Sequence, residues 1–266
     1  MDPYPDGAAL TQTLHNLYLY PGNLMKDQYF GDINDYRKYG LLRAIIDASK
    51  LRLLVAWMLT PDDGSTDGKF ITYLAQPDNW TQYDPALFTA LKDIVTHQQQ
   101  RSVSLLEETD LLPNAAYFSQ LVPDPASARE AWFNALAAQA NGSDLVFLDP
   151  DNGLEVKSKP YGRKQSSKFL YWREVEALWA AGKSLLIYQH FIREKRLPFI
   201  QRMLETLQAA TPGSFVEAFS TDKVVFLLAL QPAQQPFHPA IVQTVQANWA
   251  GQIAHWELTQ AEHATG

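Results

Sequence analysis

A strand that ends in acidic residues is the strongest candidate for chemistry in this chain. It runs Val146-Phe147-Leu148-Asp149-Pro150-Asp151-Asn152-Gly153-Leu154-Glu155. The apolar run predicts a buried strand, and Pro150 stiffens the turn that follows it. The carboxylate of Asp149 should therefore stand rigidly at the strand end, with further acceptors close by. We take Asp149, Asp151 and Asn152 as candidate catalytic residues, although a purely structural Asp-Pro turn has the same pattern.

A second polar group lies at the start of a predicted helix and reads Gly31-Asp32-Ile33-Asn34-Asp35-Tyr36-Arg37-Lys38-Tyr39. Asp32, Asp35 and Lys38 are spaced by three residues, so they share one face of the helix. Helix capping and ion pairing explain this spacing, and so does an entry loop that contacts a ligand. On the second interpretation Gly31, Asp32, Asp35 and Lys38 are ligand-binding residues.

Two further segments carry candidate residues. The loop Asp62-Asp63-Gly64-Ser65-Thr66-Asp67-Gly68 has glycines that permit close approach of a ligand, and its acids favour a ligand with amino or hydroxyl donors. In the segment Tyr188-Gln189-His190-Phe191-Ile192-Arg193, His190 is suited to act as a general base or a metal ligand, and Arg193 to bind an anion. A structural histidine at a strand end is the competing interpretation.

The charge of the chain is unevenly distributed. The net charge of −7 does not favour nonspecific binding to a polyanion. Between residues 157 and 173, however, basic residues occur without an acid, and we weigh a nucleic-acid-contacting flap against a solvated surface loop. The basic residues of this candidate flap are Lys157, Lys159, Arg163, Lys164, Lys168 and Arg173.

Strands and helices are predicted to alternate along the chain. Strands are expected at 51–59, 103–106, 144–148, 184–188, 215–219 and 224–230, and helices at 36–50, 84–99, 125–140, 171–181, 198–210 and 238–249. This order predicts an α/β fold with a three-layer, doubly wound, mostly parallel Rossmann-like sheet and an antiparallel C-terminal strand. Ligands bind beyond the carboxyl ends of such strands, so the loops after residues 59, 106, 148 and 188 should meet at one edge.

Composition excludes several classes of protein. The 266 residues are 46% hydrophobic and include no cysteine, which excludes disulfides, thiolate zinc sites and a cysteine nucleophile. No apolar run is long enough for a transmembrane helix, and the N-terminal residues do not resemble a secretory signal, so we expect a cytoplasmic protein without a membrane partner. Residues 1–24 are expected to be a poorly ordered extension, and 25–266 one Rossmann-like domain of unknown oligomeric state.

Together these segments resemble the class I S-adenosylmethionine-dependent methyltransferases, and most nearly the adenine-amine methyltransferases of ribosomal RNA. Residues 31–39 look like that family's Gly-Asn-x-Ala-Asp-x-x-Lys-His stretch, and residues 149–152 look like its Asp-Pro-Pro-Tyr. Residues 58–68 loosely resemble its Asp-Thr-His-Ala-Gly-x-Gly-x-Tyr loop. The second proline and the stacking aromatic residue are missing here. The family's ring would stack on a flipped base, so another aromatic residue, such as Tyr161 or Tyr171, would have to replace it.

The resemblance implies a methyltransferase that binds S-adenosylmethionine. Asp63, Gly64 or Asp67 would lie near its amino group, Glu107, Glu108 or Asp110 near its ribose or adenine, and Asp149 beside the methyl acceptor. The alternatives are a phosphodiesterase or nuclease that uses Mg²⁺ or Mn²⁺, and a non-catalytic Rossmann binding module. For the metal enzyme, Asp32, Asp35, Asp149, Asp151 and Glu155 with His190 would supply the ligands.

Overall fold

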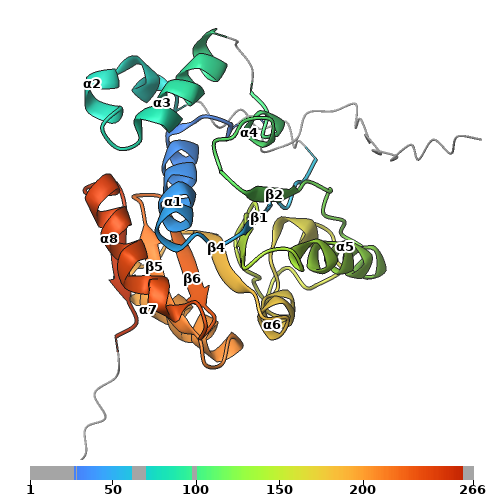
Figure 1. Cartoon of the computed structure of the whole chain (residues 1–266). Coiled ribbons are helices and arrows are strands. Elements are labelled where there is room, and N and C mark those ends of the chain that lie inside the picture. The colour runs from blue at the N-terminus through green and yellow to red at the C-terminus, as the bar shows by residue number, and fades with distance from the viewer. Residues whose placement is uncertain (1–26, 28, 62–69, 98–100, 260–266) are drawn as a thin grey trace, which may run out of the picture.

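A computed structural model describes residues 27, 29–61, 70–97 and 101–259 (Figure 1). The loop 62–68, and with it Asp63, Gly64 and Asp67, lies outside the described residues, as does the predicted extension 1–24. The helices are α1 Ile33–Ser49, α2 Pro77–Trp80, α3 Pro85–Lys92, α4 Ser104–Glu107, α5 Ala126–Ala140, α6 Trp172–Ala180, α7 Arg196–Ala210 and α8 His238–Trp249.

The strands form one sheet of seven in the order β2-β1-β3-β4-β6-β5-β7. Their bounds are β1 Leu53–Ala56, β2 Ala115–Phe118, β3 Leu145–Leu148, β4 Ser184–His190, β5 Phe215–Ser220, β6 Val224–Leu230 and β7 Ala254–Glu257. Strands β2, β1, β3 and β4 are parallel neighbours, whereas β6 pairs antiparallel with both β4 and β5, and β7 pairs antiparallel with β5. The predicted α/β class, the mostly parallel core and the antiparallel C-terminal strand are confirmed.

Both faces of the sheet are buried. Successive residues of a strand point to opposite faces, and the residues of β1 divide accordingly between two hydrophobic clusters. Leu53 and Val55 pack with apolar residues of α1, α3 and α8, whereas Leu54 and Ala56 pack with those of α5, α6 and α7. This burial explains why the central strands are continuous apolar runs without polar alternation.

The sequence predicted the wrong second strand. Residues 103–106 lie at and within the short helix α4, and the strand that pairs with β1 is Ala115–Phe118. A short apolar run does not distinguish a strand from a helix by its periodicity. The strand Ala115–Phe118 was missed because it begins with two alanines, which have low strand propensity. Strand β7 was also missed, because its four residues have little apolar character beyond Trp256.

The remaining predicted elements are present with small shifts at their ends. Helix α1 begins three residues before the predicted start, because Asp32 caps it by accepting hydrogen bonds from the amides of Asn34 and Asp35. The predicted helix 84–99 is α3 followed by a π-helical turn, Asp93–His97. Among the described residues, no helix combines the length and apolarity needed to cross a bilayer.

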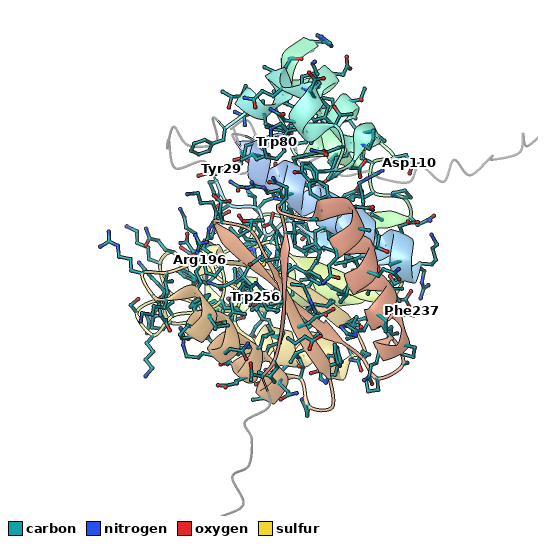
Figure 2. The ribbon with its side chains drawn as sticks, turned by 90° about the vertical axis from the view of Figure 1, so that its left-hand side faces the viewer. Tyr29, Trp80, Asp110, Arg196, Phe237 and Trp256 are labelled. Atoms are coloured by element: carbon teal, nitrogen blue, oxygen red, sulfur yellow. The ribbon has the colours of Figure 1, made fainter. Side chains whose placement is uncertain are left out.

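Helices α1 and α8 cross next to each other (Figure 2), and a glycine of α1 lies at their contact. A Cβ atom added to Gly40 of α1 would lie 1.8 Å from Cζ2 of Trp249, a fully buried residue at the end of α8. We therefore expect Gly40→Ala to lower the free energy of unfolding by about 1–3 kcal/mol, because overpacking outweighs the gain in helix propensity. Urea denaturation measures this change.

Gly142 is the matched control, because a Cβ added there meets no atom within 4 Å. Gly142→Ala should leave the denaturation midpoint almost unchanged. Equal midpoints for Gly40→Ala and the wild-type chain would contradict the close packing of α1 on α8.

Candidate active site at the carboxyl edge of the sheet

A buried lysine joins the start of α1 to the end of β3. The Nζ atom of Lys38 lies 2.7 Å from Oδ1 of Asp35, one helical turn earlier, and 3.2 Å from Oδ2 of Asp149, which follows β3. Asp35, Lys38 and Asp149 are 4%, 6% and 1% exposed, so this is a buried ion-paired cluster. The structure therefore brings together residues 31–38 and the Asp-Pro turn, which are more than one hundred positions apart in the chain.

Aromatic rings surround the ammonium group of Lys38. Its Nζ atom lies 5.3 Å from the ring centroid of Tyr39, 5.6 Å from that of Trp57 and 5.7 Å from that of Tyr188. Burial alone would lower the pKa of Lys38, but the adjacent carboxylates of Asp149 and Asp35 outweigh burial and hold the pKa above its usual range. Lys38 is therefore a fixed positive charge.

Asp35 is held on several sides. Its Oδ2 atom accepts hydrogen bonds from the hydroxyl of Tyr39 at 2.9 Å and from the backbone amide of Gly31 at 3.2 Å. Gly31 has φ +75°, a conformation that L side chains rarely adopt, and a Cβ atom there would lie 2.4 Å from the side chain of Val95. Gly31, in the predicted entry loop, is therefore required, because only glycine readily adopts the backbone conformation that directs this amide towards Asp35.

The region around Lys38 has an excess of negative charge. Two buried carboxylates, Asp35 and Asp149, contact the ammonium group, and the buried carboxylate of Asp32 is close enough to feel its charge, so the buried acids outnumber the buried cation. Burial first, and then the charge of Asp35, raise the pKa of Asp32 from 3.8 to about 6. The excess charge makes this edge suited to a cationic ligand.

The turn after β3 is also tied to its neighbours. Asp151 accepts a hydrogen bond from the hydroxyl of Thr60, in the segment that follows β1. Gly153 has φ +82° and packs on the side chain of Gln189, whose Oε1 accepts a hydrogen bond from the amide of Leu154 at 2.7 Å. These contacts join the segments after β1 and β3 to the end of β4, which confirms that the carboxyl ends of these strands meet at one edge.

Glu107 reaches the same edge from α4. Its Oε1 atom accepts hydrogen bonds from Nε1 of Trp57 at 2.8 Å and from the hydroxyl of Ser119, which follows β2. Glu108 and Asp110, the predicted cofactor residues beside it, are exposed. Of these three acids, Glu107 is therefore the one placed against the segments that follow β1 and β2.

The other predicted catalytic residues are more exposed. Asn152 is exposed, and its backbone amide donates to the carbonyl of Lys168 at 2.8 Å. His190 is exposed at the end of β4, with its ring 5.1 Å from the ring of Tyr188. Glu155 is exposed and accepts a hydrogen bond from the amide of Trp172, at the start of α6. Asn152 and His190 are thus accessible to solvent, whereas Glu155 contacts the start of a helix.

The basic segment, residues 157–173 of the candidate flap, is anchored beside the Asp-Pro turn by the residues at its two ends. Residues 152–155 pair with residues 168–170 through three backbone hydrogen bonds of 2.8–3.0 Å. Asp124 accepts hydrogen bonds from the amides of Gln165 and Ser167, which anchors the far part of the segment to the chain before α5. Of the predicted basic contacts, Lys157, Arg163 and Lys164 are exposed, and Lys159 and Lys168 are partly buried.

The two residues proposed to replace the missing aromatic residue, Tyr161 and Tyr171, pack against each other. Tyr171 is 2% exposed, and its hydroxyl donates to the carbonyl of Lys159. Tyr161 packs its ring against Tyr171 at 5.0 Å and lies under the guanidinium of Arg173 at 4.6 Å. Tyr171 is therefore enclosed by the protein, whereas Tyr161 is partly exposed and already packs against both Tyr171 and Arg173.

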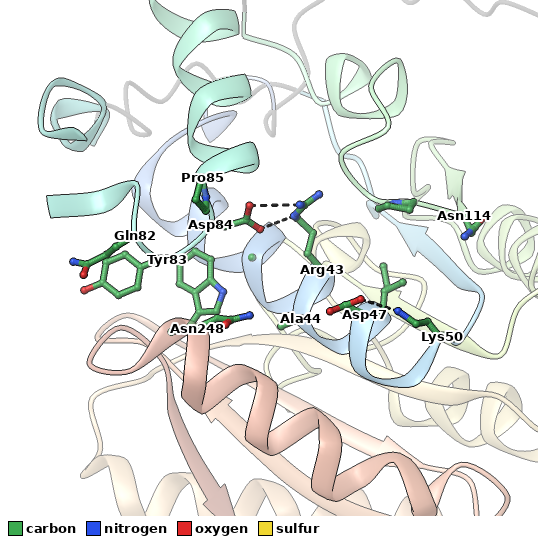
Figure 3. A pocket seen from close by; sticks show the side chains of 14 residues that line it. Arg43, Ala44, Asp47, Lys50, Gln82, Tyr83, Asp84, Pro85, Asn114 and Asn248 are labelled. Carbon is green, nitrogen blue, oxygen red and sulfur yellow. Dashed lines mark hydrogen bonds and ion pairs between the residues drawn. The ribbon is translucent and has the colours of Figure 1, made fainter. Parts of the chain in front are cut away.

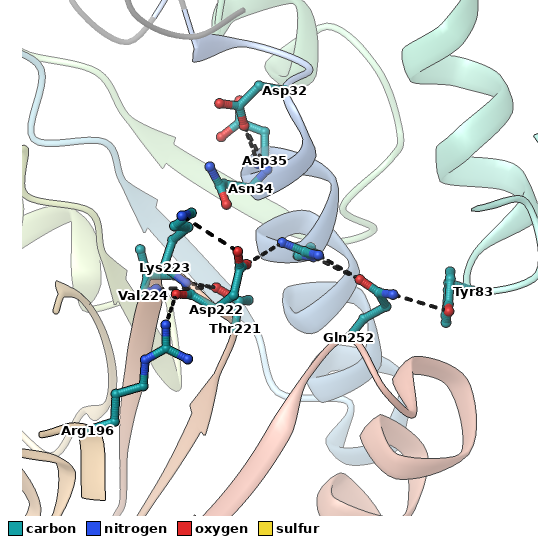
Figure 4. Close-up of polar contacts among 11 residues, drawn as sticks. Asp32, Asn34, Asp35, Tyr83, Arg196, Thr221, Asp222, Lys223, Val224 and Gln252 are labelled. Carbon is teal, nitrogen blue, oxygen red and sulfur yellow. Dashed lines mark hydrogen bonds and ion pairs between the residues drawn. The ribbon is translucent and has the colours of Figure 1, made fainter. Parts of the chain in front are cut away.

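A series of polar contacts connects α1 with the turn between β5 and β6 (Figure 4). We call the residues that make these contacts the rim. Arg37 donates to Oδ1 of Asp222 at 2.8 Å and to Oε1 of Gln252 at 2.7 Å. Arg196 donates to the carbonyl of Asp222, so three cationic side chains, Arg37, Arg196 and Lys223, gather around this turn. The rim contributes positive charge next to the buried acidic cluster.

A pocket of about 560 Å³ lies on a different face of α1 (Figure 3). It is lined by Arg43 and Asp47 of α1, and Arg43 there pairs with Asp84 at 2.6 Å. None of the predicted site residues lines this pocket, so we do not assign it to the candidate active site.

Sequence reasoning missed the residues that enclose Lys38. Tyr39, Trp57 and Tyr188 were visible only as members of apolar or aromatic runs, and no spacing rule brings them together. Thr60 and Glu107 were likewise not paired with their partners at this edge. The position of Lys38, one turn after Asp35 and directly before the apolar part of its helix, was a signal that could have indicated a buried lysine.

No protein-family model matches this sequence, and no curated protein is similar to it.

Removing the charge of Lys38 should destabilise the fold. Lys38→Met leaves Asp35 and Asp149 buried without their shared cation, so we expect the free energy of unfolding to fall by about 3–5 kcal/mol. Adding Asp149→Asn to Lys38→Met removes one of the unpaired charges and should recover part of this loss. Urea denaturation at pH 7.5 measures each variant.

Lys50→Met is the control, because Lys50 pairs with Asp47 at the same 2.7 Å distance and i,i+3 spacing, yet both side chains are 76% exposed. Its effect should stay below about 1 kcal/mol. Equal losses for Lys38→Met and Lys50→Met would contradict a buried organising ion pair.

The raised pKa of Asp32 predicts a pH dependence of stability. The folded state binds this proton more tightly than the unfolded chain, so the contribution of Asp32 to stability falls as pH rises from about 4 through about 6. Above that range its ionisation costs up to about 3 kcal/mol. Asp32→Asn keeps the capping oxygen and should raise the free energy of unfolding at pH 7.5 more than at pH 4.5.

Asp47→Asn, which changes an exposed carboxylate, is the comparison variant at the same two pH values. If Asp32→Asn were equally destabilising at both pH values, Asp32 would act only as a cap, and the burial of its charge would be unimportant.

Proposed function

We propose that this chain is an S-adenosylmethionine-dependent methyltransferase that acts on a nucleic acid in the cytoplasm. In this proposal the sheet is a three-layer, doubly wound, Rossmann-like sheet, with the ligand beyond the carboxyl ends of β1, β2 and β3. The observation that carries the proposal is the ion pair of Lys38 with Asp149. It joins two of the segments that carry the resemblance, residues 31–39 and 149–152, beside the segment that follows β1.

The donor set of the edge fits such a cofactor. S-adenosylmethionine carries a positive sulfonium, an ammonium group and a ribose diol, and the excess of buried carboxylates over cations around Lys38 favours a cation. Glu107, between the ends of β1 and β2, offers a carboxylate for hydroxyl donors. When bound, the cofactor supplies an electrophilic methyl group.

The contribution of the chain to such a reaction is mainly orientation. Methyl transfer needs in-line geometry, and little acid-base help. Lys38 and Thr60 fix the turn from both sides through Asp149 and Asp151, so the acceptor oxygens of residues 149–152 have defined positions. These oxygens are suited to accept hydrogen bonds from an amine of the substrate.

The metal-dependent phosphodiesterase is less well supported. A divalent cation bound by Asp35 and Asp149 would have to displace the ammonium group that already lies between them. The lone pairs of Asp35 are also engaged by Tyr39 and by the amide of Gly31. Carboxylates that are satisfied in this way are poor ligands for Mg²⁺ unless the cluster rearranges.

The basic segment supports a nucleic-acid acceptor. Its paired ends place the backbone of Lys168 next to Asn152, and Lys157, Arg163 and Lys164 extend from the same segment into solvent. Exposed cations bind phosphates without reading the base sequence, so they would position the acceptor rather than select it. Because the net charge of −7 disfavours binding of a polyanion to the rest of the surface, we expect such binding at this segment.

Calorimetric titration with S-adenosylhomocysteine tests the cofactor. We expect saturable one-to-one binding by the wild-type chain, at least about tenfold weaker binding by Asp149→Asn, and unchanged binding by Asp47→Asn. A second arm measures transfer of a tritiated methyl group from S-adenosylmethionine to RNA, to DNA and to protein. Changing Lys157, Arg163 and Lys164 together to glutamate should reduce transfer to nucleic acid and leave binding of S-adenosylhomocysteine unchanged.

No binding of S-adenosylhomocysteine at millimolar concentration would overturn the methyltransferase proposal. If Mg²⁺ or Mn²⁺ instead raised the melting temperature, and Asp149→Asn abolished that rise, the metal-dependent phosphodiesterase would replace it. No response to either ligand would favour the non-catalytic binding module.

A further inference from the structure

A second cluster of chemically active side chains lies in the antiparallel part of the sheet. It consists of Glu217 on β5, His238 at the first position of α8, and His255 on β7. The Nε2 atoms of His238 and His255 lie 2.8 Å and 2.7 Å from the same atom, Oε2 of Glu217. Three separate elements therefore direct one ligand atom each to a common point.

The acid of this cluster is completely buried. Glu217 is 0% exposed in the middle of a strand whose other residues are mainly apolar, and burying a carboxylate is costly unless it is paired or binds a metal. The side chains of His238 and His255 are 19% and 10% exposed, so water has limited access. An acid retained at such a position needs a compensating positive charge.

Hydrogen bonds within the cluster leave donors and acceptors unused. Among the described residues, neither Oε1 of Glu217 nor Nε2 of His238 has a hydrogen-bond partner. The 2.8 Å approach of His238 to Glu217 is close enough for an ion pair, but it lacks the geometry of a hydrogen bond. The lone pairs of both groups are therefore available to a cation.

The strand register adds another carboxylate nearby. Glu257 of β7 lies directly opposite Glu217 of β5 in the antiparallel pair. Directly opposed side chains project from the same face of a sheet, and like charges at such a pair are destabilising. A bound cation would relieve this repulsion.

We propose that Glu217, His238 and His255 form a binding site for a divalent transition-metal ion, with Zn²⁺ as the best match. Two imidazoles and one carboxylate form a donor set that holds Zn²⁺ and leaves one coordination position open. With metal–ligand bonds of about 2.0–2.1 Å and tetrahedral angles, neighbouring ligand atoms are about 3.3 Å apart. Each imidazole nitrogen lies 2.7–2.8 Å from the carboxylate oxygen, so a separation of only about half an ångström more would admit the ion.

The ion would connect the C-terminal elements. It would link β5, α8 and β7, whose ligands span residues 217–255, and so stabilise the edge of the sheet. Strands β4 and β6 lie between β5 and β3, so this site is separate from the cluster around Lys38. The proposal therefore does not depend on the proposed methyltransferase function.

Titration of the chelator-treated chain with Zn²⁺ tests this site. We expect one ion per chain, and a rise of the thermal midpoint by about 5 °C or more when Zn²⁺ exceeds its dissociation constant about one-hundredfold. Glu217→Gln, His238→Gln and His255→Gln should each weaken binding by more than about 100-fold. Circular dichroism of the metal-free variants separates loss of a ligand from loss of the fold.

His97→Gln is the matched control, because His97 lies outside the cluster, is 69% exposed and pairs with the exposed carboxylate of Asp93. It should bind Zn²⁺ like the wild-type chain, as should Asp149→Asn. Co²⁺ bound to the wild-type chain should show visible absorption typical of a four-coordinate ion. Failure of the wild-type chain to bind Zn²⁺ stoichiometrically, or wild-type affinity in His238→Gln and His255→Gln, would overturn the proposal.

Discussion

The burial of one ammonium group constrains the arrangement of the whole carboxyl edge. A lysine that is 6% exposed must find charged partners, and Lys38 finds them in Asp35 of its own helix and in Asp149 after β3. These two contacts fix the rotation of α1 and its position on the sheet. The aromatic rings around Lys38 exclude water from the pair and so strengthen it.

The same constraint determines the electrostatic character of the edge. One cation cannot neutralise three buried carboxylates, and the pKa of Asp32 is raised to about 6 because of burial and of its neighbour Asp35. Retaining such charge costs stability, a pattern that is common where a protein binds a ligand. Basic residues lie outside this centre, since Arg37 pairs with Asp222 and the basic segment 157–168 follows the Asp-Pro turn in the chain.

Much of this arrangement could be predicted from the sequence because strong local signals agree with the fold. The apolar run before Asp149 indicated β3, the spacing of Asp35 and Lys38 indicated their ion pair, and the alternation of elements indicated the mostly parallel sheet. The strand Ala115–Phe118 was missed because its position depends on pairing with β1 and not on its own propensity. The cluster of Glu217 with two histidines was also missed, although an acid within the run 215–219 signals a buried charge.

The central claim is that the edge organised by Lys38 and Asp149 is a ligand site. A crystal structure of the chain grown with S-adenosylhomocysteine tests this claim most directly. We expect the thioether to lie at the ends of β1 and β3, within reach of residues 149–152, while the ion pair of Lys38 with Asp149 stays intact. Density for the ligand in the pocket between Arg43 and Asp84, or no density in crystals of a chain that binds it in solution, would contradict the account.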